Sequence, residues 1–181
     1  NDAWFASRAA AVASYLLCWA ALAGGLFMSS GWFDGLISRA RLLSVHQWAS
    51  LASVLFGAYH AFLLVRDPLA DFTLPGILVP FLSSDRPAAT GLGTLVLYLG
   101  LVVSLSFWLR PRIGAARWRT IHRASFLVYV GGLWHALQLG SDARNPAMLG
   151  LYLCTSGVVL VGVVVRLSYH RATVRRSPAG A

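Results

Sequence analysis

The chain has 181 residues, enough for one domain of ordinary size, and 57% of them are hydrophobic, with a mean hydropathy of +0.66. These values exceed those of soluble globular proteins and exclude an ordinary soluble domain. The net charge of +9 comes from fifteen arginines and six aspartates, without lysine or glutamate. We expect a membrane protein, and we assign the basic charge to topology and contact with anionic membrane lipid rather than to nucleic-acid binding.

The apolar residues gather in five runs that are long enough to cross a bilayer, which takes about 20 residues in a helix. The runs cover residues 9–28, 43–65, 91–109, 121–140 and 147–168. None of them alternates apolar and polar residues as the strand of a membrane barrel does. The sequence therefore predicts an all-α, polytopic membrane helix bundle with five transmembrane helices, forming a single membrane domain over residues 1–181.

The arginines divide unequally between the two sides of these predicted spans. One side receives four arginines and five aspartates, and the other receives eleven arginines and Asp34. The eleven are Arg39, Arg41, Arg110, Arg112, Arg117, Arg119, Arg123, Arg166, Arg171, Arg175 and Arg176. By the positive-inside rule the arginine-rich side is cytoplasmic. The N-terminus is then outside, and the C-terminus, with its basic tail at 169–181, is inside.

Four of the five histidines lie in two of the predicted spans: His46 and His60 in the second, His122 and His135 in the fourth. Ionisable residues inside a span mark functional sites by default, although a single neutral histidine can also simply hydrogen-bond to a neighbouring helix. Because one span separates them, the second and fourth spans run in the same direction. We therefore expect two facing pairs, His46 with His122 near the inner surface and His60 with His135 near the outer surface.

Paired imidazoles at two depths suit two b-type haems, because such an iron takes one neutral histidine on each side of an apolar macrocycle. Fourteen residues between His46 and His60 correspond to about 21 Å along a helix, most of a ~30 Å hydrocarbon core. Small residues near the histidines should let a flat macrocycle approach: Ser50, Ser53, Gly57, Ser125, Gly131 and Gly132. Arg119 and Arg123, which flank His122, either bind the propionates of the inner haem or anchor the chain at the interface.

The thirteen-residue interval between His122 and His135 falls about 140° short of four helical turns. An ideal helix cannot present both rings on one face. We therefore expect either a local distortion near Gly131–Gly132 or haems splayed around the helix.

Two other chemistries fit the sequence less well. A proton or cation pathway would recruit carboxylates within the spans, whereas every aspartate lies in a loop or at the end of a span. A zinc site needs ligands that converge on one ion, whereas the two histidine pairs are separated by about 20 Å.

The segment 67–90 joins the second and third predicted spans. Its apolar centre, LPGILVPFL, is too short and too interrupted by proline to cross the membrane. We expect it to form a lid over the outer surface.

Three stretches of the chain are similar to those of a known family: LLSVHQWASLASVLFGAYHAFLLVRD, LVPFLSSDRPAATGLGTLVLYLGLVVSLSFWLR and RWRTIHRASFLVYVGGLWHALQLGSD. With their unequal His-x13-His and His-x12-His spacing, they resemble the ferric reductase-like transmembrane domain, which NADPH oxidases share, over about residues 40–168. The resemblance implies that His46 and His122 bind the iron of an inner haem b, and His60 and His135 that of an outer one. Members of this family pass electrons from cytoplasmic NAD(P)H through flavin to the haems and then to an acceptor outside.

The chain departs from that family in two respects. The family usually has six spans where we count five, and no flavin or nicotinamide domain follows the fifth span. We therefore expect an electron-transfer subunit of the bacterial inner membrane, supplied by a quinol or by a separate flavoprotein that docks on the arginine-rich face. The alternative is a structural or assembly subunit of a larger membrane complex, with or without working haems. Whether the chain is an enzyme on its own stays open.

Overall fold

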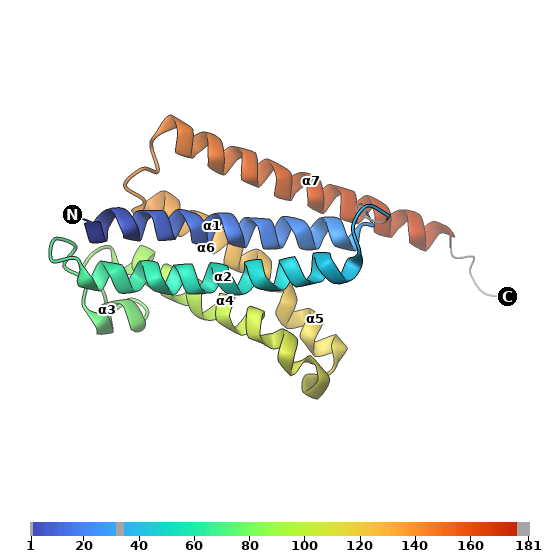
Figure 1. Ribbon diagram of the computed structural model, residues 1–181, viewed down its shortest axis with the longest axis horizontal. Coiled ribbons are helices and arrows are strands. Elements are labelled where there is room, and N and C mark those ends of the chain that lie inside the picture. The colour runs from blue at the N-terminus through green and yellow to red at the C-terminus, as the bar shows by residue number, and fades with distance from the viewer. Residues whose placement is uncertain (1, 32–34, 177–181) are drawn as a thin grey trace.

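The computed structural model describes residues 2–31 and 35–176, which form seven helices and no strand. In chain order these are α1 (Asp2–Ser29), α2 (Arg39–Arg66), α3 (Leu74–Leu78), α4 (Pro87–Ile113), α5 (Ala115–Arg123), α6 (Ser125–Leu139) and α7 (Pro146–Arg176). Figure 1 shows the long helices running along the length of the molecule. The predicted all-α class is confirmed.

Four of the described helices are long and apolar enough to cross a membrane: α1, α2, α4 and the Pro146–Tyr169 part of α7. They correspond to the predicted first, second, third and fifth spans. The predicted fourth span is represented by α6, whose 15 residues reach about 22 Å, less than a ~30 Å hydrocarbon core. The five-span count is therefore not confirmed, and the orientation of the termini stays a prediction.

The two ends of the bundle differ in composition. At one end lie the N-terminus, α3, the start of α4 and the α6–α7 connection (Figure 1); we call it the lid end, because it contains segment 67–90. At the other lie the start of α2, α5 and the end of α7, and we call it the arginine-rich end. The helix α7 extends into the predicted basic tail as far as Arg176, and residues 177–181 lie outside the described part.

Local sequence explains where several helices begin and end. The hydroxyl oxygen of Thr73 accepts a hydrogen bond from the amide of Gly76 (3.2 Å), which caps α3. Pro87 opens α4, where its missing N–H costs no helical bond. The same helix ends at Gly114, whose φ of +83° is a conformation that glycine adopts readily.

The predicted fourth span is interrupted at Ala124 rather than at its glycines. The amide of Ala124 bonds to the carbonyl of Ile121 (3.0 Å), a tighter turn than in an α-helix, and this residue separates α5 from α6. The helix α6 continues unbroken through Gly131 and Gly132. The interruption thus lies between His122 and His135 but not at the glycines, and the alternative of haems splayed around the helix stays a prediction. Gly131 instead packs against α4, because a Cβ atom on it would lie 2.6 Å from Val96 Cγ2.

The small residues of α2 serve helix packing. The Ser14 hydroxyl of α1 donates to the Ser53 carbonyl (2.8 Å), and Ser50 and Ser104 of α4 share a hydrogen bond (2.7 Å). A Cβ atom on Gly57 would lie 3.2 Å from Ser14 Oγ. Small residues commonly let membrane helices approach one another. Helix packing accounts for these positions here, and their expected role in leaving room for a macrocycle stays a prediction.

A small buried core joins α1, α6 and α7 through Leu22, Leu26, Tyr129 and Val159. Beside it the Tyr15 hydroxyl lies 2.6 Å from Thr155 Oγ1 and 3.1 Å from the Tyr129 hydroxyl. Such polar contacts hold helices together where lipid removes the hydrophobic driving force. Many large apolar side chains are exposed instead, as in a protein whose solvent is lipid.

Candidate functional site: two histidine pairs

The first pair joins α2 and α5 towards the arginine-rich end. The ring centroids of His46 and His122 lie 5.8 Å apart, with an angle of 66° between their planes. The Nδ1 atom of His46 lies 2.9 Å from the carbonyl oxygen of Ala21 on α1. Gly25 permits this approach, because a Cβ atom there would lie 3.3 Å from the ring of His46. The structure thus brings together the two side chains that the sequence analysis paired at the inner level.

The second pair lies at the lid end. The Nδ1 atom of His60 lies 3.0 Å from the carbonyl oxygen and 2.9 Å from the hydroxyl oxygen of Ser7, a buried residue of α1. The Nδ1 atom of His135 on α6 lies 2.8 Å from the carbonyl oxygen of Ala89, in the first turn of α4. His60 and His135 are close enough to interact electrostatically.

The hydrogen bonds define the tautomer of three of these rings. A carbonyl oxygen only accepts, so Nδ1 of His46, His60 and His135 must carry the proton and donate it. Each Nε2 then keeps its lone pair. Metal-binding histidines use this arrangement, in which the second ring nitrogen donates to a carbonyl and fixes the ring orientation.

His122 is held differently. Its ring stacks on the indole of Trp118 one turn earlier in α5, with centroids 5.0 Å apart and planes 20° from parallel. The guanidinium carbon of Arg110, at the end of α4, lies 5.0 Å from the centre of the Trp118 ring system. Trp118 Nε1 is buried and has no hydrogen-bond partner among the described residues.

A family model for the ferric reductase like transmembrane component matches residues 9–133, well over half of the chain. The chain belongs to this family. The match includes three of the four paired histidines and ends just before His135. Comparison with curated proteins and with solved structures gives no match.

The resemblance seen in the sequence is thus confirmed, and the chain is a ferric reductase-like membrane redox component. Haem is the cofactor that members of this family bind. An imidazole nitrogen binds a metal at about 2 Å, so one iron between two histidines separates their ring centroids by about 6 Å. The 5.8 Å between His46 and His122 agrees with this value. The orphaned Trp118 Nε1 beside them is a free donor for a carboxylate. The inner pair therefore fits the group.

The ring of His135 is packed closely between helices. Gly93 of α4 lies directly against His135, and a Cβ atom on Gly93 would come within 2.6 Å of His135 Nδ1. The ring is thereby confined between α4 and α6. Among residues 2–31 and 35–169 no group of three or more His, Cys, Asp or Glu side chains could hold a metal by itself.

The lid segment is held against the start of α4, next to His135. The Thr94 hydroxyl donates to the carbonyl of Ile77 (2.8 Å), and the Thr90 hydroxyl donates to that of Asp85 (2.9 Å). Gly91 allows close contact, because a Cβ atom there would lie 2.6 Å from the amide nitrogen of Phe81. Segment 67–90 thus packs onto the helix that orients the outer pair.

Arg119 and Arg123 lie on α5 on either side of His122, and both are exposed. Neither forms an ion pair within the described ranges. Their predicted contact with haem propionates stays a prediction.

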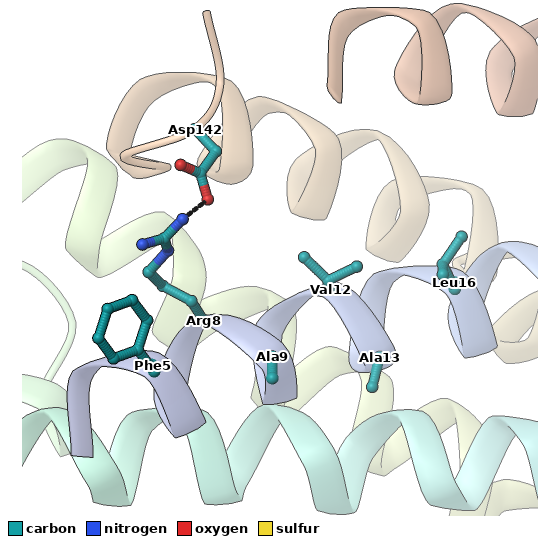
Figure 2. A pocket seen from close by; sticks show the side chains of 7 residues that line it. All are labelled: Phe5, Arg8, Ala9, Val12, Ala13, Leu16 and Asp142. Atoms are coloured by element: carbon teal, nitrogen blue, oxygen red, sulfur yellow. Dashed lines mark hydrogen bonds and ion pairs between the residues drawn. The ribbon is translucent and has the colours of Figure 1, made fainter. Parts of the chain in front are cut away.

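A separate cavity of about 500 Å³ lies on α1, away from both histidine pairs. Figure 2 shows its lining residues, with Arg8 directed towards Asp142 of the α6–α7 connection, with which it forms an ion pair. The remaining lining residues, all apolar, are Phe5, Ala9, Val12, Ala13 and Leu16. The cavity therefore adds no ligand to either pair.

The sequence analysis missed the residues that hold the rings, chiefly Ser7, Ala21, Ala89, Gly93 and Trp118. Three of them act through backbone carbonyls, which every residue possesses, so their identity gives no signal. Trp118 was detectable, because position i+4 on a helix places it beside His122.

Proposed function

We propose that this ferric reductase-like chain is a di-haem b-type membrane cytochrome, which relays electrons across the bilayer between a separate donor and an acceptor on the other side. The inner haem b is held by His46 and His122 and the outer one by His60 and His135. The observation that best supports the proposal is the 5.8 Å separation of the two inner rings, which matches one iron between them. The three Nδ1-bonded histidines support it further.

In this proposal the histidines bind the cofactor and backbone carbonyls orient their rings. When bound, a haem held by two of these imidazoles would supply reversible one-electron chemistry. The histidines bind the iron through Nε2, and the carbonyls of Ala21, Ser7 and Ala89 keep those rings oriented. The two levels are separated by about 21 Å, because fourteen residues lie between His46 and His60 on the unbroken helix α2.

The distribution of arginines indicates the end of the bundle at which the electron donor docks. The arginine-rich end presents Arg110, Arg112, Arg117, Arg119 and Arg123, all exposed. Such a surface attracts an acidic partner and raises its association rate. A flavoprotein docking there supplies electrons near the inner pair, and a quinol is the other source that we propose. The acceptor then lies at the lid end.

The same distribution of arginines indicates how the chain is oriented in the membrane. We propose that α5 and α6 together form the fourth crossing, that the N-terminus lies outside and the C-terminus in the cytoplasm, and that the membrane is the bacterial inner membrane. Exposed apolar side chains along the long helices then face the lipid.

The test is a reduced-minus-oxidised absorption spectrum of the purified protein, with the haem content measured per chain. We expect b-type absorbance and about two haems per chain. His60→Ala should reduce the content to about one and abolish electron transfer across proteoliposome membranes. His170→Ala is the matched control, because His170 belongs to neither pair, and it should leave the content unchanged.

Two results would count against the proposal. Absence of b-type absorbance from the wild-type protein would leave the alternative function, a structural or assembly subunit of a larger membrane complex. Unchanged haem content in His60→Ala would refute the ligand assignment.

A further inference from the structure

The four imidazoles are not held in the same way. Three donate from Nδ1 to a backbone carbonyl at 2.8–3.0 Å, which fixes the rotation of the ring about its Cβ–Cγ bond. No hydrogen bond holds His122 within the described residues, and it lies just before the helix interruption at Ala124. Something else must therefore fix its rotation.

The indole of Trp118 is the group in position to do so. It covers one face of the His122 ring at 5.0 Å and 20° from parallel, and residues four apart on a helix face the same side. The same indole is in reach of Arg110, whose guanidinium carbon lies 5.0 Å from the ring centre. Because Arg110 belongs to α4 and Trp118 to α5, the stack ties the orientation of His122 to two helices.

We propose that Trp118 is the positioning residue of His122 and that, by stacking, it sets the 66° angle between the planes of His122 and His46. This inference rests on the proposed function, since the angle matters to an iron that both rings bind. The indole stacks on one face of the ring, whereas an imidazole nitrogen binds a metal in the plane of the ring. Trp118 therefore acts through His122 and is not itself an iron ligand.

The stack makes the inner site spectroscopically distinct. Low-spin ferric haem between two imidazoles gives a highly anisotropic EPR signal when the ring planes are far from parallel and an ordinary rhombic signal when they are nearly parallel. An angle of 66° belongs to the first class. We expect the wild-type protein to show a highly anisotropic signal from the inner haem.

The test compares Trp118→Leu with Trp118→Phe by EPR and by redox titration of the purified holoprotein. Leucine removes the stacking face, so the anisotropic signal should broaden and shift, with a change in the midpoint potential of one haem or loss of that haem. Phenylalanine keeps a stacking face and should preserve both haems and the signal. Trp134→Leu is the matched control, because Trp134 neighbours His135 in sequence but is 57% exposed. It should change neither the EPR signal nor the midpoint potentials.

The outcomes separate the inference from the proposed function. A wild-type protein without b-type absorbance refutes the function itself. Two bound haems that both give rhombic signals refute the role of Trp118 and leave the function intact, even if Trp118→Leu does not accumulate in the membrane. The role is also refuted if Trp118→Leu leaves the signal unchanged, or if Trp118→Phe behaves like Trp118→Leu.

Discussion

Backbone carbonyls orient His46, His60 and His135, and this choice of partner has a physical advantage. A carbonyl in a helix is fixed in position by its neighbours, so a ring that donates to it loses its rotational freedom before any ligand binds. A histidine ring can approach a neighbouring helix this closely only where that helix has a small residue at the contact. Gly25 and Gly93 supply that space beside His46 and His135.

Gly93 provides the sharpest test of this requirement. In Gly93→Ala the new methyl group would lie within 2.6 Å of His135 Nδ1, and this ring cannot move away without losing its bond to the Ala89 carbonyl. We expect the variant to lose the outer haem and keep the inner one, as measured by haem content per chain.

Gly132→Ala is the matched control for that change. A methyl group there would meet Val96 at 3.8 Å, an ordinary contact, so the haem content should stay the same. Equal haem content in Gly93→Ala and the wild-type protein would contradict the confinement of His135 by α4.

The histidine pairing could be predicted because it depends on spacing. His46 and His60 lie on one helix, and the depth of each residue follows from a rise of 1.5 Å per residue. The carbonyl partners could not be predicted, because they depend on how α1 and α4 rotate about their axes, and every residue has a carbonyl. The role of Ser53 and Gly57 could not be decided from the sequence for a similar reason, since small size suits a helix contact as well as a cofactor.

At the scale of helices, the hydropathy pattern located the long elements well but not the division of the fourth. Four predicted spans correspond to α1, α2, α4 and α7. The break at Ala124 could not be predicted, because no proline or glycine lies at that position. It allows α5, which is amphipathic and arginine-rich, to leave the direction of α6 (Figure 1).

Polar contacts at different depths join α1 to α7 and to the α6–α7 connection. Near the lid end Arg8 pairs with Asp142, and deeper in the bundle Tyr15 bonds to Thr155. Between them lies the apolar cavity of Figure 2. With the bond from Trp19 Nε1 to the carbonyl of Thr155 (3.1 Å), these contacts attach α1 to α7 and to the connection before it.

Asp142→Asn should weaken this attachment at the lid end. The side chains of Arg8 and Asp142 are 35% and 37% exposed, so we expect a loss of about 1 kcal/mol in the free energy of unfolding, at the upper end for a partly exposed ion pair. The measurement is the thermal denaturation midpoint of the detergent-solubilised protein. Asp85→Asn is the control, because the Asp85–Arg86 pair is longer (3.6 Å) and more exposed, and it should have a smaller effect.

Tyr15→Phe tests the deeper contact. Removal of the hydroxyl breaks its bonds to Thr155 and Tyr129, and hydrogen bonds between membrane helices contribute about 0.6 kcal/mol each on average. We expect a loss of about 1 kcal/mol, which would lower the same denaturation midpoint. Tyr59→Phe, at an exposed position of α2, should leave the midpoint unchanged. Equal effects of the two changes would show that the Tyr15 contacts do not stabilise the bundle.

At the scale of the whole molecule, charge and histidine depth define one axis. The start of α2, the end of α4 and α5 bring their arginines to the end that contains His46 and His122. His60 and His135 lie towards the opposite end, beside segment 67–90. This coincidence of charge with depth makes the direction of insertion decisive for function, because it determines which histidine pair faces the cytoplasm.

Labelling of single cysteines should establish that direction. In a chain with Cys18→Ala and Cys154→Ala, we would place one cysteine at Ala88, exposed at the start of α4, or at Ala116, exposed in α5. Because arginine-rich segments stay in the cytoplasm, a membrane-impermeant maleimide added to spheroplasts should label Ala88→Cys directly and Ala116→Cys only after permeabilisation. The reverse pattern would place His46 and His122 on the outer side, and the docking surface for a cytoplasmic flavoprotein would then have to lie at the lid end.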